Sequence, residues 1–121
     1  MNETLSLIKA LSDETRLRIL NLLMDGEVCV CHIAEALRIG QSKTSRHLAY
    51  LKHAGWVSDR REGLWVYYRL AQSKSRFLRK EIEALKICFE ENQPFQQDRR
   101  GLHNLMKRNG ACPPAVLHVH E

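Results

Sequence analysis

Two cysteines separated by a single residue, Cys29 and Cys31, carry the most distinctive chemistry in the chain. Thiolates are soft ligands, suited to soft ions such as trivalent arsenic, trivalent antimony or cadmium. On a regular helix, residues two positions apart point about 200° away from each other, whereas in an extended segment they share a face. We therefore predict a soft-ion site whose ligation forces or stabilises a non-helical conformation at the start of the helix that contains the pair.

A trivalent metalloid prefers three thiolates, and the pair supplies only two, so the identity of a third ligand is left open. Either Cys29 and Cys31 suffice, or Cys112 joins them from the same chain or from a second subunit. Cys112 precedes two prolines in a segment that resembles a tail, so we expect an accessible thiol. His32 adjoins the pair and can serve a borderline ion, but we expect it to face solvent. Cys88 lies on the apolar side of a later helical segment, which predicts packing in the core or at an interface.

Three other uses of the cysteines compete with ion binding. Oxidation of Cys29 or Cys31 would recruit Cys88 or Cys112, because a two-residue spacing strains a mutual disulfide. A cysteine-based enzyme needs a loop of backbone donors for phosphate or arsenate beside the thiol, but the residues after Cys31 are HIAEALR, without glycine. We predict that the protein is not an enzyme. The remaining alternative, a DNA-binding dimer without an effector, leaves the cysteine pair unexplained.

Residues 41–57, QSKTSRHLAYLKHAGWV, form the second distinctive stretch. On a helical wheel Thr44, Leu48 and Leu51 share one face, which predicts burial of that face. The opposite face is small, polar and basic, and the major groove of DNA admits a helix of this kind. The predicted DNA contacts lie at the helix start and along this face: Gln41, Ser42, Lys43, Ser45, Arg46 and His47. His47 lies on the flank, where phosphate contact or packing is expected as readily as base contact.

The elements before this stretch complete a helix-turn-helix. Helical periodicity covers residues 4–11, and Ser12 is the predicted N-cap of a second helix that ends at Gly26. A short helix around residues 33–37 stops by Gly40, directly before the predicted reading helix. Two short helices joined by three or four residues, the second with a polar front, are typical of a helix-turn-helix.

The segment after Gly55 alternates in the manner of β-strands. We predict strands over residues 56–61 and 64–70, joined by a turn at residues 62–63, which together make a wing behind the reading helix. Arg60 and Arg61 near its tip would reach phosphates or a minor groove. The aromatic residues of this hairpin can also stack on single-stranded bases, but β-propensity and core packing account for them without that assumption.

Residues 74–92 return to helical period, with an apolar stripe wider than a small winged domain requires. This surplus predicts pairing with a second subunit, as in DNA readers that bind two half-sites. We therefore divide the chain into a winged helix-turn-helix DNA-binding and dimerisation domain at 1–92 and a C-terminal tail at 93–121 with room for one short helix. The fold class is mainly α with a β-hairpin wing, forming a homodimer through its terminal helices.

Composition agrees with a nucleic-acid partner. The chain of 121 residues carries a net charge of +5, with basic residues concentrated between Arg38 and Arg61. Such a basic segment favours double-stranded DNA as the partner. No apolar run approaches the roughly 18–20 residues of a membrane span, and the N-terminus has no secretory pattern, so we expect a cytoplasmic protein without a membrane partner.

Four segments together resemble the ArsR/SmtB family of metal-responsive transcriptional repressors: DETRLRIL at 13–20, CVCHIAEAL at 29–37, QSKTSRHLAYLKHAGWV at 41–57 and REGLWVYYRL at 61–70. The resemblance spans most of the chain, from residue 3 to residue 91. It implies a winged helix-turn-helix homodimer that pairs through its terminal helices. It also implies a repressor that leaves its operator when a metal or metalloid binds.

Within this family, a CVC pair at the start of the first helix of the helix-turn-helix is typical of the arsenite-sensing (ArsR) subgroup. The resemblance implies As(III) or Sb(III) as inducer at Cys29 and Cys31, with no cofactor required for DNA binding. That subgroup often has a third cysteine where this chain has Ala34. Zinc-sensing members use Asp and His on the dimerisation helix, but residues 74–92 contain no histidine. The alternative within the same fold is a thiol-redox-responsive or a cadmium- or lead-responsive repressor.

Overall fold

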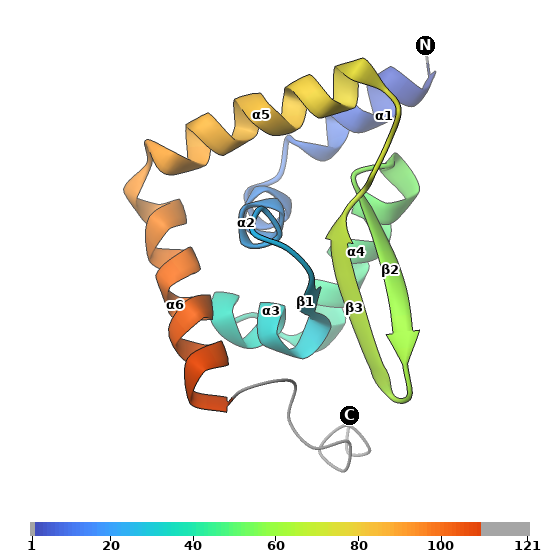
Figure 1. The fold of residues 1–121 in the computed structure, drawn as a ribbon. Coiled ribbons are helices and arrows are strands. Elements are labelled where there is room, and N and C mark those ends of the chain that lie inside the picture. Colours follow the sequence, from blue (N-terminus) through green and yellow to red (C-terminus); the bar gives the residue numbers. More distant parts are fainter. Residues whose placement is uncertain (1, 110–121) are drawn as a thin grey trace.

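The computed structural model describes residues 2–109. Its elements in chain order are α1 (Asn2–Ala10), α2 (Glu14–Leu22), β1 (Val28–Cys29), α3 (Val30–Leu37), α4 (Gln41–Ala54), β2 (Val57–Glu62), β3 (Trp65–Leu70), α5 (Arg76–Glu90) and α6 (Gln93–Asn109). Figure 1 shows a mainly helical body with the β2–β3 wing on one side. The predicted fold class, mainly α with a β-hairpin wing, is confirmed.

The start of α2 differs from the prediction by one residue. Asp13, not Ser12, is the N-cap, and its carboxylate accepts a hydrogen bond from the backbone N–H of Arg16 at 2.9 Å. Ser12 instead donates its hydroxyl to the carbonyl of Lys9 at 2.8 Å and so ends the preceding helix. Aspartate and serine are both good N-caps, so composition alone did not distinguish the two adjacent positions.

The helix-turn-helix consists of α3, a turn at residues 38–40, and α4. Arg38 ends α3 in the left-handed region at φ 58°, which reverses the chain towards α4. The predicted back face of α4 is confirmed, because Thr44, Leu48 and Leu51 are all fully buried. Gly55 ends α4 at φ 103°, a conformation that glycine adopts without a steric penalty.

The wing belongs to a sheet of three antiparallel strands in the order β1-β3-β2. Residues Val28 and Cys29 of β1 pair with Tyr68 and Tyr67 of β3. Sequence periodicity did not predict β1, because two residues are too few to establish alternation. Because β1 pairs with β3, Cys29, the first cysteine of the pair, belongs to the same sheet as the wing.

The core lies between α2, α3, α4 and the sheet, and Trp56 is one of its largest buried side chains. The indole Nε1 of Trp56 donates to the carbonyl of Leu7 at 2.8 Å. This bond fixes α1 against the junction of α4 and β2. The reading helix is therefore held from behind by both apolar packing and a hydrogen bond.

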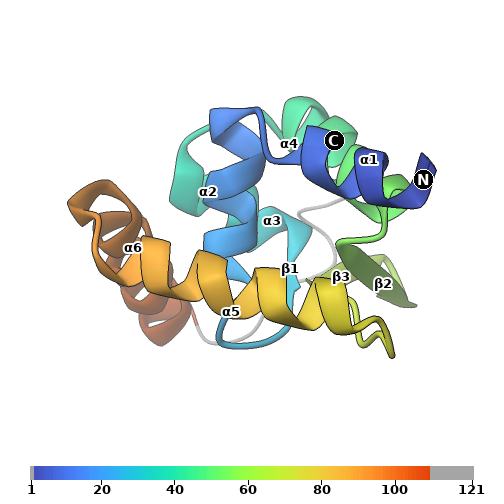
Figure 2. The same ribbon diagram turned by 90° about the horizontal axis from the view of Figure 1, so that it is seen from above.

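Helix α5 crosses one side of the body, and α6 turns from its end to run alongside α2 and α3 (Figures 1 and 2). With 17 residues, α6 is longer than the short helix predicted in this region. Pro94 lies in its first turn, where a missing N–H costs no intrahelical bond, so the proline does not interrupt the helix. The domain boundary at residue 92 stays a prediction.

Candidate DNA interface and thiol site

The sulfur atoms of Cys29 and Cys31 lie close together in this structure. Cys29 is extended (φ −72°, ψ 144°) and caps α3, which begins at Val30, so Cys31 falls in the first helical turn. The two Sγ atoms are 3.0 Å apart. The predicted non-helical conformation is therefore present at Cys29, and the role of ligation in forcing or stabilising it stays a prediction.

The surroundings of the pair are more buried than expected. Cys29 is 2% exposed, and the neighbouring His32 is also 2% exposed, so the prediction of a solvent-facing histidine is wrong. The reason is packing, because α3 is covered by α2, α4, α6 and β3 and has little free surface. Within residues 2–109, His32 Nε2 has no hydrogen-bond partner, and burial lowers the pKa of this imidazole.

The structure does not supply a third metal ligand from the part of the chain that it describes. Among residues 2–109, no three His, Cys, Asp or Glu side chains cluster closely enough to hold a metal ion. Cys112, the predicted third thiolate, lies outside the described residues. Cys88 is exposed on α5, so it does not pack in the core of the protomer, and the predicted interface remains its alternative.

The predicted DNA face of α4 is exposed. Ser42, Lys43, Ser45 and Arg46 are all accessible, and Gln41 at the helix start is half-buried. These side chains come from the first two turns of α4, as expected of a recognition helix that meets a groove with its N-terminal end. The geometry thus leaves a polar, basic helix end available to a nucleic acid.

His47 lies on the flank of α4, between the exposed and buried faces. Its side chain is 18% exposed, and Nδ1 lies 3.9 Å from an oxygen of Asp13. Burial is the main cause that lowers the pKa of His47, and Asp13 opposes this effect without overcoming it. The imidazole is therefore neutral at neutral pH.

One cleft of about 250 Å³ connects Cys29 to the DNA face. Cys29 lines it together with Gln41 and Ser45 of α4 and Arg61 of the wing. Residues predicted separately as metal ligand, helix contact and wing contact thus share a single cleft. Cys29 thus lines the same cleft as residues that are expected to meet DNA.

The two predicted wing arginines differ in their surroundings. Arg61 is exposed and lines the cleft opposite α4. Arg60 instead forms ion pairs with Glu27 and Glu62. The structure therefore brings Arg61, and not Arg60, to the reading helix, while the DNA contact of either arginine stays a prediction.

Sequence reasoning missed two further features of this region. Glu27 reaches the wing by pairing with Arg60, although 33 positions separate them. On the outer side of α4, the guanidinium of Arg16 lies 4.1 Å above the ring of Tyr50, one turn beyond Arg46. No local pattern marks either contact, because each joins elements that are distant in the sequence.

A helix-turn-helix followed directly by a wing, with the polar end of its second helix exposed, defines a winged helix-turn-helix DNA-binding protein. Among residues 2–109, no helix is both long and apolar enough to cross a membrane. Residues 13–59, which run from the N-cap of α2 into β2, match the family described as bacterial regulatory protein, arsR family.

Two relatives and one solved structure extend this match. The arsenic resistance transcriptional regulator ArsR1 of Pseudomonas putida is 54% identical over 63 residues, which are 51% of this chain and 49% of that protein. The arsenical resistance operon repressor of Escherichia coli is 44% identical over 88 residues, covering 72% of this chain and 75% of the repressor.

The solved structure is the homodimeric winged helix-turn-helix DNA-binding domain of a possible ArsR-family transcriptional regulator from Mycobacterium bovis. It superposes with a TM-score of 0.63 at 33% identity, covering 74% of this chain and 81% of that domain. The chain belongs to the arsR family of bacterial regulatory proteins. These findings confirm the predictions of a winged helix-turn-helix transcriptional regulator and of a protein that is not an enzyme.

Proposed function

We propose that this protein represses transcription by binding operator DNA and leaves that DNA when trivalent arsenic or antimony binds Cys29 and Cys31. The observation that carries the proposal is the 3.0 Å separation of the two Sγ atoms beside the cleft that Gln41, Ser45 and Arg61 also line. The names of the Pseudomonas and Escherichia relatives support the choice of arsenic. The reaction belongs to the reducing cytoplasm, where cysteines are kept in the thiol form.

Ligation exchanges hydroxide for thiolate at the metalloid. Arsenous acid and two thiols form two As–S bonds, and each thiol proton leaves with one hydroxide as water, so the oxidation state of arsenic does not change. The two sulfur atoms, 3.0 Å apart, could together hold one soft ion as thiolate ligands. Cys112 is our candidate for a third thiolate, supplied by the same chain or by a second subunit.

Release of DNA follows from the position of the thiols. Cys29 is both the N-cap of α3 and a member of β1, and α3 packs directly against α4. When the two sulfur atoms rearrange around a bound ion, the backbone at the start of α3 moves. The cleft beside α4 changes shape with it. A coupling free energy of about 1.4 kcal/mol between the two sites is enough to change DNA affinity tenfold.

The DNA contacts that we propose are those of α4 and of the wing. Ser42, Ser45 and Arg46 read the major groove, while Gln41 and Lys43 position the start of the helix on the duplex. His47 contributes from the flank of α4 as a neutral group, and Arg61 acts from the wing. No cofactor is required for this binding.

A homodimer supplies the two reading helices. Large apolar side chains are exposed on α1 and α5: Leu5, Ile8, Phe77 and Ile87. Both helices lie along the top of the molecule in Figure 1, and the related Mycobacterium domain is homodimeric. We expect Ile8→Glu and Ile87→Glu to shift the protein to a monomer in analytical ultracentrifugation and to weaken DNA binding.

Fluorescence anisotropy on a duplex from the promoter directly upstream of its own gene tests the function. Under reducing conditions, arsenite and antimonite should release the wild-type protein, while Cys29→Ser and Cys31→Ser should remain bound. Cys88→Ser is the matched control, because this exposed cysteine lies on α5, away from the cleft. Failure of both metalloids to release the wild-type protein would reject the proposal.

The same titration separates the alternatives. Release by cadmium or lead, with no response to arsenite, would assign a different soft ion to the same thiols. Release by peroxide alone would assign a thiol-redox switch. A Cys112→Ser variant that responds normally to arsenite would remove Cys112 from the ligand set and leave a site of two thiolates.

A further inference from the structure

One row of residues crosses the whole sheet and joins the cysteine pair to the wing. In the register of β1 and β3, Cys29 lies opposite Tyr67, and in the register of β3 and β2, Tyr67 lies opposite Arg60. Because the strand order is β1-β3-β2, these three residues form one continuous row. The backbone at Cys29 is therefore connected through β3 to the strand that carries Arg60.

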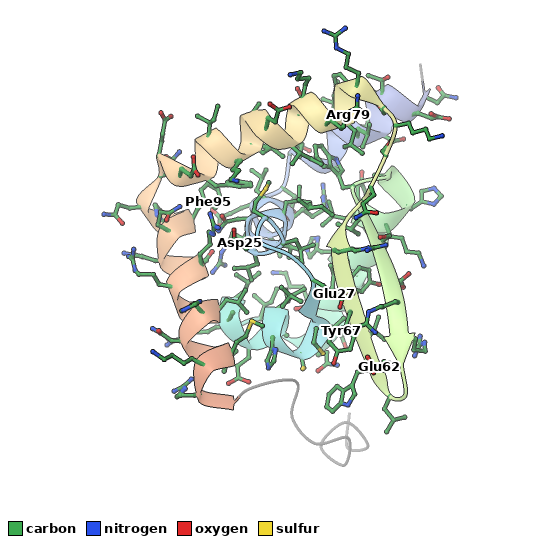
Figure 3. The ribbon with its side chains drawn as sticks, viewed as in Figure 1. Asp25, Glu27, Glu62, Tyr67, Arg79 and Phe95 are labelled. Carbon is green, nitrogen blue, oxygen red and sulfur yellow. The ribbon has the colours of Figure 1, made fainter. Side chains whose placement is uncertain are left out.

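Arg60 is also bound to the segment that leads into Cys29. Its Nε and Nη2 donate to the two carboxylate oxygens of Glu27 at 2.7 and 2.8 Å. Glu27 directly precedes β1, so this two-pronged pair connects β2 with the chain two residues before Cys29. Figure 3 shows Glu27, Tyr67 and Glu62 along the wing sheet. The wing is thus attached to the cysteine segment by the strand ladder and by an ion pair.

Arg60 also contacts Glu62 and the ring of Tyr67. Nη1 donates to Glu62 at 2.8 Å, and the guanidinium lies 4.5 Å from the centre of the Tyr67 ring. All three nitrogens of the side chain therefore bind carboxylates of the protein. A guanidinium that faces two carboxylates presents a local net negative charge, which disfavours a DNA phosphate.

Arg61 has the opposite environment. It lines the cleft with Gln41 and Ser45. The side chain of Arg60, its neighbour in β2, points to the other face of the sheet, because successive side chains in a strand alternate. The two adjacent arginines are therefore separated by the sheet into one that faces α4 and one that faces Glu27.

We propose that Arg60 does not bind DNA but is a positioning residue, which transmits occupancy of Cys29 and Cys31 to the wing through Glu27 and Tyr67. When β1 moves on ligation, Glu27 and the row through Tyr67 move Arg60, and β2 carries Arg61 away from its place opposite α4. This proposal rests on the proposed function for its metalloid step. The claim that Arg60 does not contact DNA is tested in an experiment that uses no metalloid.

The first experiment measures the salt dependence of DNA binding. A plot of log K for DNA binding against log salt has a negative slope, and each lost phosphate contact reduces the magnitude of that slope by about one. We expect Arg61→Gln to reduce the magnitude by about one and Arg60→Gln to leave it unchanged. A slope that falls equally in both variants would overturn the proposal, because it would make Arg60 a phosphate contact.

The second experiment measures coupling, as the ratio of the DNA affinity without arsenite to the DNA affinity with arsenite. Glu27→Gln and Arg60→Gln should bind arsenite with wild-type affinity, measured by the near-ultraviolet absorbance of the As–thiolate bond, but should reduce the ratio by roughly threefold or more. Glu62→Gln is the matched control, because it removes the same charge from Arg60 but leaves the pair with Glu27. It should keep the wild-type ratio.

Both arms are read only after far-ultraviolet circular dichroism confirms that each variant is folded. We expect folded variants, since Arg60 and Glu62 are exposed and such pairs contribute little to stability. If Glu27→Gln and Arg60→Gln keep the full ratio, the proposed transmission is wrong. If arsenite fails to release the wild-type protein, the proposed function is wrong, and the salt slopes still decide whether Arg60 contacts DNA.

Discussion

Arg18 and Asp98, eighty positions apart, form a two-pronged ion pair. Nε and Nη2 of the arginine donate to the two carboxylate oxygens at 2.8 and 3.0 Å. The pair joins α2 to α6, and Asn21 of α2 adds a bond from its amide to the carbonyl of Phe95 at 2.8 Å. Helix α6 is therefore fixed to the same body that holds α3 and the cysteine pair.

Asp98→Asn should destabilise the protein. The substitution removes the charge from a hydrogen-bonded pair whose side chains are only 28% and 14% exposed, so we expect a loss of about 1–2 kcal/mol in the free energy of unfolding. Urea denaturation followed by circular dichroism measures this loss. Glu83→Gln, which breaks the well-exposed Lys80–Glu83 pair, is the control and should change stability little. Equal effects in the two variants would contradict the role assigned to Asp98.

Trp56→Phe should loosen α1. Trp56 is 1% exposed, and the substitution removes the indole N–H that the carbonyl of Leu7 accepts. The lost hydrogen bond costs about 0.5–1.5 kcal/mol, and the smaller ring adds a packing loss. The thermal unfolding midpoint and amide hydrogen exchange of α1 measure the two effects. Unchanged exchange in α1 would mean that apolar packing alone holds this helix.

His47→Gln should make stability less sensitive to acid. Burial holds the pKa of His47 below the value of 6.5 expected in an unfolded chain. As pH falls below that value, the unfolded chain takes up the proton first, so the contribution of the neutral imidazole to stability is complete above pH 6.5 and is lost on acidification. The linked loss at pH 5.5 is at most about 1.4 kcal/mol.

Urea midpoints of the wild-type protein and the His47→Gln variant at pH 7.5 and pH 5.5 measure this linkage. The wild-type midpoint should fall further than that of the variant. The comparison isolates His47, because both proteins keep their other histidines. Parallel falls in the two proteins would show that His47 takes no part in the acid response.

Arg46→Ala should reduce both affinity and sequence discrimination. Arg46 is exposed on the polar face of α4, where a guanidinium that reads a guanine contributes about 1–3 kcal/mol of discrimination at one base pair. Anisotropy on a set of single-base operator variants measures it. Lys43→Ala is the comparison, and we expect it to weaken all sequences alike. A uniform loss for Arg46→Ala would reduce Arg46 to a phosphate contact.

The elements that the sequence predicted well are those with local signals. The apolar spacing of Thr44, Leu48 and Leu51 predicted the buried back of α4, and alternation predicted the two strands of the wing. A helical period or an alternation is repeated several times within one element, so neighbouring residues are enough to reveal it. The Cys29–Cys31 spacing likewise indicated soft-ion chemistry through residue type alone.

The sequence by itself thus determined the reading helix, the wing and the identity of the thiol pair. Only the tertiary structure decided that Cys29 lies in the wing sheet opposite Tyr67, that His32 is buried, that Arg60 turns to Glu27, and that α6 is bound to α2 through Asp98. Each of these outcomes depends on a partner from a distant part of the chain. Such pairings follow from how whole elements pack, and no pattern among adjacent residues specifies them.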